Sequence, residues 1–570
     1  MENKSTDQDM QRDDGTPDDV HSYTTLPFSE YGQSWQYTIN TPPPNEDGRT
    51  PIGHAPARTR IRHIRLLYTL LASVSILALI LCGMGYFTRE SSPIHTTGNA
   101  LQAVSCPFTL GSGMVAEQNV QCRTLSVPQL HDQPTGPTIK LMIAIFMAPN
   151  TTQDNEPVIY LTGGPGGSAL NDLGPYITAQ NLDRVTLGHK LILLDQRGTG
   201  NSRPTLNCHE IDELFQTNTA NPDTDVGREQ YKQAARSCKQ RLMAAGVNLN
   251  AYNTLENARD VHDVVQALSA THVNLYGVSY GTRLALTVMH LFPNDLRSVI
   301  LDSTVPTQLN IFSSEPAVTQ HAFDTLLQGC MAVTSCDMAH PDLSETFYRE
   351  VDTLNARPIT FTAQRTRSSN ATTVTMSGDD LVDWIYQALY VTSFIPILPA
   401  LITQISQGDY TLIGHYYNYF AQSGRISYGM YYSVECSEDL AFTTQEQLDQ
   451  ALLTLHSELR PLITDDLHAT RAICQGLHVQ AVPASQKQAV HSTIPTLILA
   501  GEYDPITPPT NGLEAEKTLG KSFFFEFPGT GHGVFLTNSC PDSIMTAFLL
   551  QPTIKPDGQC IDNMPEPRFQ

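Results

Sequence analysis

One short stretch, residues 273–285, constrains the fold of this 570-residue chain more than any other. It reads V-N-L-Y-G-V-S-Y-G-T-R-L-A, an apolar run, then G-V-S-Y-G, then the start of a helical apolar pattern. This order predicts a strand, a sharp turn and a helix, with Ser279 at the apex of the turn. Gly277 and Gly281 supply the small residues needed where strand and helix nearly touch. A lone G-x-S-x-G can arise by chance, so the rest of the chain decides its meaning.

Short apolar runs that end in glycine- or aspartate-bearing loops recur along the chain. Such runs, alternating with helical patterns, predict a mostly parallel sheet with helices on both faces. The chemistry of these sheets collects at the carboxyl ends of the strands. The predicted strands are residues 139–148, 157–161, 190–194, 273–276, 297–301, 496–500 and 522–527.

A different pattern interrupts the strands at residues 306–485. It contains helical periodicity and many tyrosines but no clear strand alternation, so it predicts a helical cap inserted into the sheet domain. The sheet domain then has two parts, residues 105–305 and 486–570. An independent second domain is the alternative, and it is disfavoured because strand-like runs resume after residue 485.

The N-terminal region has a separate organisation. Residues 1–63 are polar, with few aliphatic residues, and are expected to be a disordered cytoplasmic tail. Residues 66–88 carry no charge and follow an arginine cluster, so residues 64–88 are expected to form one transmembrane helix. With residues 89–104 as a linker, the bulk of the chain would be extracytoplasmic, or secreted if the anchor is clipped. A cleaved signal peptide is the alternative, disfavoured by the long segment that precedes the apolar run.

The cysteines also indicate an oxidising compartment. One of the eleven, Cys82, lies in the apolar segment, and the other ten form an even set. Sequence does not fix their connectivity, and the most economical pairing joins neighbours along the chain. That pairing is 106–122, 208–238, 330–336, 436–474 and 540–560. Metal binding is the weaker alternative, because these cysteines show no C-x-x-C spacing.

Two residues on later loops can make Ser279 a nucleophile. A serine hydroxyl needs a base, usually a histidine, which in turn needs a carboxylate to hold it. His532 follows the last predicted strand between glycines, and Asp504 follows the strand before it. The order Ser279, Asp504, His532, each after a strand, is typical of α/β-hydrolases. Asp302, after the strand that follows the nucleophile, is the rival acid.

The transition state of acyl transfer also needs two backbone N–H donors for its oxyanion. Tyr280, directly after the nucleophile, is predicted to supply one. The glycine-rich loop 163–167 is predicted to supply the other through Gly164, where the backbone must approach the substrate closely. Asp195 and Arg197 are expected to brace this loop through charge-assisted hydrogen bonds.

Five motifs in order resemble the prolyl aminopeptidase family of α/β-hydrolases, and most closely its tripeptidyl-aminopeptidase-like branch. They are L-T-G-G-P-G-G-S (161–168), D-Q-R-G-T-G-N-S (195–202), Y-G-V-S-Y-G-T (276–282), G-E-Y-D-P-I-T-P-P (501–509) and G-T-G-H-G (529–533). Thr162 stands where prolyl aminopeptidases carry histidine, which favours the tripeptidyl branch. The resemblance implies a serine exopeptidase without a cofactor, and a family C-terminal region at about residues 430–565.

An aminopeptidase must read a positive α-amino group, and carboxylates in the cap are the natural means. The sequence E-C-S-E-D at 435–439 matches a C-x-E-D element of the family. Glu438 is therefore the predicted amine contact, with Glu435 and Asp439 behind it. A solvated acidic surface anchored by a disulfide is the alternative.

Three functions remain open from the sequence. The first is a serine exopeptidase for peptides with free N-termini, and the second is an esterase for small acyl esters, since one triad serves both reactions. The third is a non-catalytic binding protein, disfavoured because all three triad members are present. The net charge of −23 argues against a nucleic-acid partner.

Overall fold

The computed structural model describes residues 100–147, 156–217, 220–364, 371–420, 426–564 and 567–569. These residues belong to one compact unit. The predicted tail and transmembrane helix lie outside the described residues, as does most of the linker. Within the part of the chain that the structure describes, none of the helices is both long and apolar enough to span a membrane.

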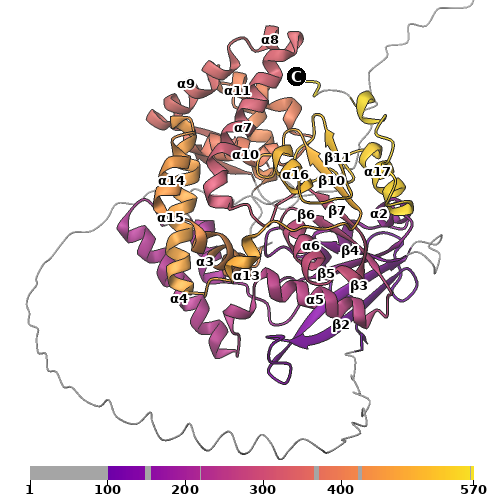
Figure 1. The fold of residues 1–570 in the computed structure, drawn as a ribbon. Coiled ribbons are helices and arrows are strands. Elements are labelled where there is room, and N and C mark those ends of the chain that lie inside the picture. Colours follow the sequence, from indigo (N-terminus) through magenta and orange to yellow (C-terminus); the bar gives the residue numbers. More distant parts are fainter. Residues whose placement is uncertain are drawn as a thin grey trace, which may run out of the picture. The chain divides into compact units, whose positions relative to one another are not determined.

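A nine-stranded sheet forms the centre of the unit (Figure 1). Its strand order is β1-β2-β3-β5-β4-β6-β7-β10-β11. The first four strands in this order pair antiparallel, and the run from β5 to β11 pairs in parallel. The strands are β1 (Gln102–Ala103), β2 (Val120–Pro128), β3 (Thr138–Met147), β4 (Val158–Leu161), β5 (Lys190–Asp195), β6 (Val273–Val278), β7 (Leu296–Asp302), β10 (Thr496–Gly501) and β11 (Ser522–Phe527).

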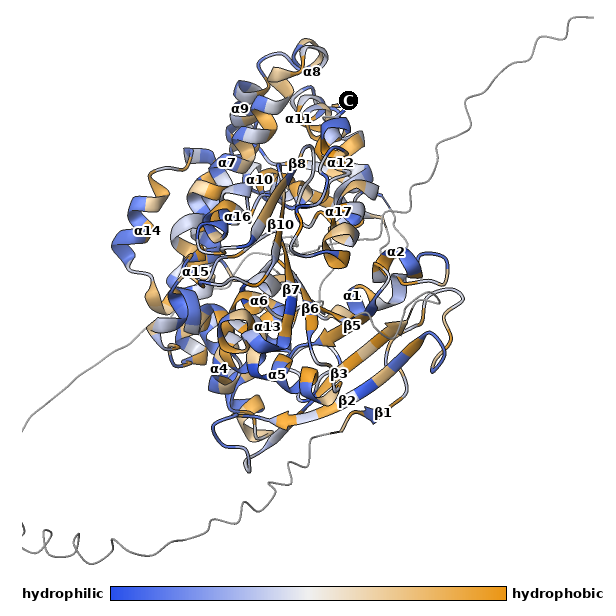
Figure 2. Cartoon of the chain, turned by 45° about the vertical axis from the view of Figure 1, so that its right-hand side comes forward, coloured by the Kyte–Doolittle hydropathy of each residue, from blue (hydrophilic) through white to orange (hydrophobic). Residues whose placement is uncertain are grey.

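Both faces of the sheet are covered, as expected because its central strands β4 to β7 and β10 are almost entirely buried. Tyr160 and Tyr276 pack on the face covered by α1 (Ala169–Asp172), α2 (Leu182–Thr186) and α17 (Ser539–Leu550). Their chain neighbours Leu161 and Leu275 pack on the face covered by α5 (Thr254–Ala267), α6 (Tyr280–Leu291) and α16 (Pro509–Glu516). Figure 2 shows the central strands as largely hydrophobic. The predicted mostly parallel sheet with helices on both faces is confirmed.

A mainly helical segment lies between β7 and β10, with its own hydrophobic core. Its helices are α7 (Ile311–Ala332), α8 (Thr334–Ala339), α9 (Leu343–Ala356), α10 (Gly378–Leu389), α11 (Leu398–Ser406), α12 (Thr411–Tyr416), α13 (Tyr428–Val434), α14 (Gln445–Leu452) and α15 (Arg460–Leu477). It also holds an antiparallel hairpin, β8 (Ile359–Ala363) with β9 (Thr372–Met376). The sequence showed no clear strand alternation here, and this hairpin, which is separate from the main sheet, is an addition to the predicted helical cap.

Two helices from the first part of the chain join this cap. These are α3 (His209–Thr217) and α4 (Asp225–Ala244), which share a hydrophobic cluster with α13 and α15. Tyr280, the first residue of α6, belongs to the same cluster. The cap is therefore built from two separate stretches of sequence and packs directly beside the predicted nucleophile.

Five disulfides hold the unit. Their pairs are Cys106–Cys122, Cys208–Cys238, Cys330–Cys336, Cys436–Cys474 and Cys540–Cys560. The neighbour pairing inferred from the sequence is confirmed at every position.

Candidate active site

Ser279 lies at a strained turn between β6 and α6. Its φ and ψ angles are 57° and −127°, a combination that side-chain-bearing residues rarely adopt. A Cβ on Gly281 would lie 1.9 Å from the carbonyl oxygen of Leu161, and one on Gly277 would lie 2.4 Å from the Gly281 oxygen. Both glycines are thus required by close backbone contact, and the turn places the buried serine on the wall of a cavity at the carboxyl end of the sheet.

Asp504 and His532 form a buried pair on the loops after β10 and β11. The Nδ1 atom of His532 lies 2.9 and 3.0 Å from the two Asp504 carboxylate oxygens. Thr507 joins them, since its Oγ1 donates to Asp504 at 2.7 Å and lies 3.1 Å from the same Nδ1. Burial alone would raise the pKa of Asp504, but the His532 charge and the Thr507 hydrogen bonds hold it below its ordinary value. The carboxylate therefore stays ionised beside the imidazole.

Asp302, the rival acid, has other partners. Its carboxylate accepts hydrogen bonds from the backbone N–H groups of Val534 and Phe535 and from the hydroxyl of Tyr276. Its backbone oxygen accepts from the N–H of Ser279 at 3.0 Å. Burial raises its pKa to about 6. Asp302 thus ties the histidine loop to the serine turn, and the acid that contacts His532 is Asp504.

The glycine-rich loop packs directly against the serine. A Cβ on Gly163 would lie 2.7 Å from the Ser279 Cβ, so only glycine fits there. Gly164 has a φ of +116° and lines the same cavity as Ser279 and Tyr280. The structure therefore brings both predicted oxyanion residues to the nucleophile, and their catalytic roles stay predictions.

The loop is braced by two residues of the D-Q-R-G motif. Asp195 accepts from the Ser168 hydroxyl and the Leu170 N–H at 2.8 and 3.0 Å. Gln196, which the sequence reasoning missed, donates to the Thr162 oxygen at 2.8 Å. Its position between the two residues that were singled out was the available signal.

Arg197 does not brace the loop. It is fully buried, forms a two-point ion pair with Asp260 on α5, and donates to the carbonyl of Gln129. The prediction for Arg197 was therefore wrong, because its partner Asp260 is set by tertiary packing that the motif does not reveal.

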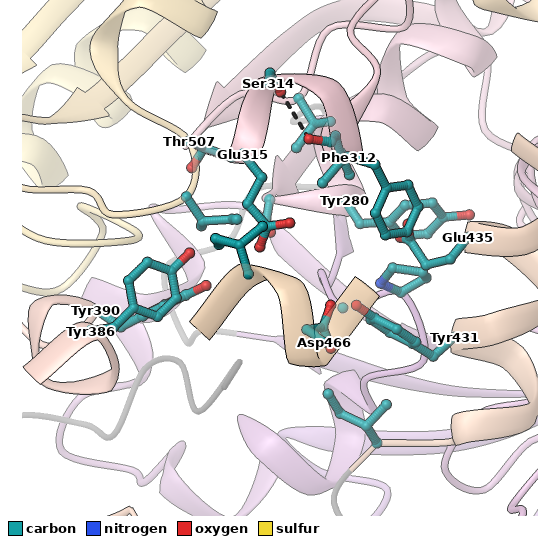
Figure 3. A pocket seen from close by; sticks show the side chains of 18 of the residues that line it. Tyr280, Phe312, Ser314, Glu315, Tyr386, Tyr390, Tyr431, Glu435, Asp466 and Thr507 are labelled. Carbon is teal, nitrogen blue, oxygen red and sulfur yellow. Dashed lines mark hydrogen bonds between the residues drawn. The ribbon is translucent and has the colours of Figure 1, made fainter. Parts of the chain in front are cut away.

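A cavity opens above Ser279 between the sheet and the cap, with about 1350 Å³ of free space including its mouth. Its wall includes Ser279, Tyr280 and Gly164. Elsewhere the wall carries apolar side chains, four tyrosines and four carboxylates (Figure 3). The carboxylates are Glu315, Asp383, Glu435 and Asp466. The arrangement suits a substrate with apolar parts and positive charge.

Glu435, rather than Glu438, faces this cavity. Both Glu438 oxygens accept hydrogen bonds from Thr254, at 2.6 Å from its N–H and 2.7 Å from its hydroxyl. Glu438 is absent from the wall, so its predicted role as the amine contact does not fit the structure. Asp439 forms ion pairs with Arg283 and Lys487. The E-C-S-E-D element forms a π-helical turn, and this turn directs Glu438 toward Thr254.

The Glu438–Thr254 contact continues to the residue after the nucleophile. The Thr254 hydroxyl lies 2.8 Å from the Tyr280 hydroxyl, and the Asn257 amide donates to the same hydroxyl at 3.3 Å. Glu438 therefore helps to hold Tyr280 in place.

The Glu435 carboxylate is buried without a hydrogen-bond partner. The residue is 3 % exposed, and no hydrogen bond or ion pair joins its carboxylate to any other described residue. Burial raises its pKa well above the ordinary value, the charge of Asp439 adds to this, and the charge of Arg283 opposes it. A buried acid without a partner on a cavity wall is poised to pair with a cation.

The described residues offer little for a metal. One group, Cys208, Glu210 and Cys238, places three ligand-type atoms close together. Its two sulfur atoms are joined in a disulfide, so they cannot act as thiolate ligands.

Comparison with known proteins assigns the chain to a fold family and finds hydrolases among its relatives. The family model for the alpha/beta hydrolase fold matches residues 156–539. The chain is 27% identical to the serine protease Hip1 of Mycobacterium tuberculosis over 542 residues, 88% of this chain and 98% of the relative. It is 26% identical to carboxylesterase B of the same species, over 77% of this chain and 86% of the relative. It is 29% identical to the tripeptidyl aminopeptidase of Streptomyces coelicolor, over 33% and 35% of the two chains.

Proposed function

The chain belongs to the alpha/beta hydrolase fold family, and from this premise we propose that it is a serine peptidase acting on peptides with free N-termini. One observation carries the proposal. Ser279, in its strained turn, shares a cavity with the buried carboxylate of Glu435, which accepts no hydrogen bond from any described residue. The first feature suits acyl transfer, and the second suits a positive amino group.

The chemistry follows from the residues around Ser279. The serine hydroxyl attacks the scissile carbonyl while His532 takes its proton, and Asp504 stabilises the resulting imidazolium. The backbone N–H groups of Gly164 and Tyr280 stabilise the oxyanion. His532 then returns the proton to the leaving amine, and an acyl-enzyme remains on Ser279. A water molecule, deprotonated by His532, releases the acyl group by the same steps.

Glu435 is proposed to bind the α-ammonium group of the substrate. An ammonium in this place would satisfy a carboxylate that is otherwise buried without a hydrogen bond. The relatives named serine protease and tripeptidyl aminopeptidase support a peptide substrate. The tripeptidyl and prolyl alternatives share this mechanism and differ in the number of residues that each cut releases.

We also propose that the enzyme works outside the cytoplasm as a single-pass membrane protein, anchored through residues 64–88. The five disulfides support an oxidising compartment. The anchor itself rests on the apolar, charge-free sequence alone.

Esterase activity is the second candidate, because the same residues serve ester hydrolysis and one relative is named carboxylesterase B. The test compares a tripeptide anilide with a free N-terminus, its N-acetylated form and a short acyl ester. Hydrolysis of the free anilide at least 100-fold faster than the acetylated one supports the proposal. Equal rates, or turnover of the ester alone, would reject the exopeptidase function. Product masses give the number of residues released.

A further inference from the structure

The cavity carries more acidic groups than one α-ammonium group requires. Four carboxylates line it, and its described wall contains no lysine, arginine or histidine. With Glu435 assigned to the α-ammonium group, three remain: Glu315 on α7, Asp383 on α10 and Asp466 on α15. Each of the three is partly buried, and a positive group beside such acids lowers the cost of ionising them.

These three acids come from three different helices and line the same cavity. The charge of Asp466 acts on both Glu315 and Asp383 and raises the pKa of each. Burial is the larger cause in both cases, giving a pKa of about 8 for Glu315 and about 7 for Asp383. Figure 3 shows Glu315 and Asp466 between the Tyr386–Tyr390 pair on one side and Tyr431 with Glu435 on the other.

Two of the cavity acids have no partner of their own. The carboxylates of Glu315 and Glu435 accept no hydrogen bond and form no ion pair among the described residues. Glu435 is also buried, with 3 % of its surface exposed. Asp383 accepts one long hydrogen bond of 3.4 Å from Gln387. The wall therefore offers acceptors for more than one positive group.

The spacing of the acids favours an organic cation over a metal ion. In the described part of the chain, no three of the cavity carboxylates lie close enough together to hold one metal ion. Phe312, Tyr386 and Tyr431 lie among them on the wall. Aromatic faces between carboxylates suit a long alkyl stem with a charged end, as in lysine or arginine.

We propose that Glu315, Asp383 and Asp466 form a second cationic subsite, which takes the side chain of a lysine or arginine on the N-terminal side of the scissile bond. This inference rests on the proposed function, because it assumes a peptide bound to Ser279. The preferred substrates are then short basic peptides with a free N-terminus, bearing two positive charges that meet two groups of acids.

The first test uses the unchanged protein and pairs of substrates. Tripeptide anilides with a free N-terminus carry either lysine or norleucine, its neutral analogue, at each position in turn. At one or more positions kcat/KM is expected to be at least about 10-fold higher for lysine, since a charged group enters an acidic site. A norleucine peptide cut as fast as its lysine counterpart at all positions would overturn the inference.

Variants locate the effect. In the double variant Glu315→Gln with Asp466→Asn, the lysine-to-norleucine ratio of kcat/KM is expected to fall to within about 3-fold of one. The control Asp324→Asn removes the same charge from α7 at a residue outside the cavity wall, and should keep the ratio. A ratio that survives in the double variant would assign lysine recognition to other residues and overturn the subsite.

A binding measurement separates this inference from the proposed function. Should no peptide be cut, calorimetry with 1,5-diaminopentane and with pentylamine still decides whether the cavity holds two cations. Binding of the diamine at least about 10-fold tighter than the monoamine, lost in the double variant, supports the subsite even if the peptidase proposal fails. Equal binding of the two amines would overturn the subsite.

Discussion

Replacing Glu435 with glutamine removes the negative charge that is proposed to bind the substrate amino group, while the side chain keeps its size. The residue is 3 % exposed, so the ammonium–carboxylate contact would form away from solvent. A hydrogen bond to a charged group contributes about 1.5–3 kcal/mol. Its loss should lower kcat/KM for a peptide with a free N-terminus by about 10- to 150-fold.

The assay compares two substrates on each variant. One is a tripeptide anilide with a free N-terminus, and the other is its desamino analogue, which lacks only the α-amino group. Glu435→Gln should lower kcat/KM for the first substrate and leave kcat/KM for the second within about 3-fold, because the desamino analogue has no ammonium group to pair with the carboxylate. The matched control is Glu438→Gln, which alters the Thr254 contact behind Tyr280 and should affect both substrates alike.

The pH dependence gives an independent readout of the same residue. Glu435 has a raised pKa because of burial, then of Asp439 and Glu438, opposed by Arg283 and Lys487. A raised pKa means that the empty cavity holds the proton at low pH and must release it to bind an ammonium group. The ratio of kcat/KM for the free over the desamino substrate should therefore rise with pH until the substrate amine itself loses its proton, near pH 8. In Glu435→Gln this rise should vanish.

The reasoning is refuted by a selective loss in the wrong variant. If Glu438→Gln lowered kcat/KM only for the substrate with a free N-terminus, and Glu435→Gln left that value unchanged, Glu438 would be the amine contact, as predicted from the sequence.

Three further predictions concern the serine turn, the triad and the disulfides. In thermal unfolding, Gly281→Ala should lower the free energy of unfolding by about 3 kcal/mol or abolish labelling of Ser279 by a fluorophosphonate, because the added Cβ would lie 1.9 Å from a carbonyl oxygen. The control Gly520→Ala has 3.6 Å of clearance, so its free energy of unfolding should stay within about 1 kcal/mol of the unchanged protein. Asp504→Asn should lower kcat by about 10⁴-fold through loss of the carboxylate that orients His532, and a loss below 10-fold would contradict its assignment. Replacing both cysteines of Cys436–Cys474 with serine should lower the free energy of unfolding in denaturant by about 4 kcal/mol, because this disulfide closes a loop of 38 residues. The same change at Cys330–Cys336, whose loop spans 6 residues, should cost about 2 kcal/mol, and the reverse order would contradict the loop-entropy explanation.

The central sheet could be predicted because its strands are short, apolar runs that end in turn-forming loops. The strand before Ser279 and the two strands that carry Asp504 and His532 were all recognisable for this reason. β2 was missed, since its buried positions alternate with partly exposed polar ones. The β8–β9 hairpin was missed for the same reason, as β8 buries only two of its five residues.

Side-chain partners could not be predicted from motifs. The E-C-S-E-D element indicated acids near the site, but a π-helical turn decides which acid faces the cavity. Glu438 contacts Thr254 and Arg197 contacts Asp260, and each contact joins residues that are more than 60 positions apart. Glu315, Asp383 and Asp466 come from three separate helices, so only the packed cap brings them into one cavity.

Covalent trapping on Ser279 tests the central claim most directly. An aza-tripeptide 4-nitrophenyl ester with a free N-terminus should acylate the enzyme once per molecule and leave a slowly hydrolysed adduct. Peptide mapping by mass spectrometry is predicted to place the adduct on Ser279, and the N-acetylated ester should react at least about 10-fold more slowly. An adduct on another residue, or equal rates for the two esters, would contradict a serine peptidase that reads free N-termini.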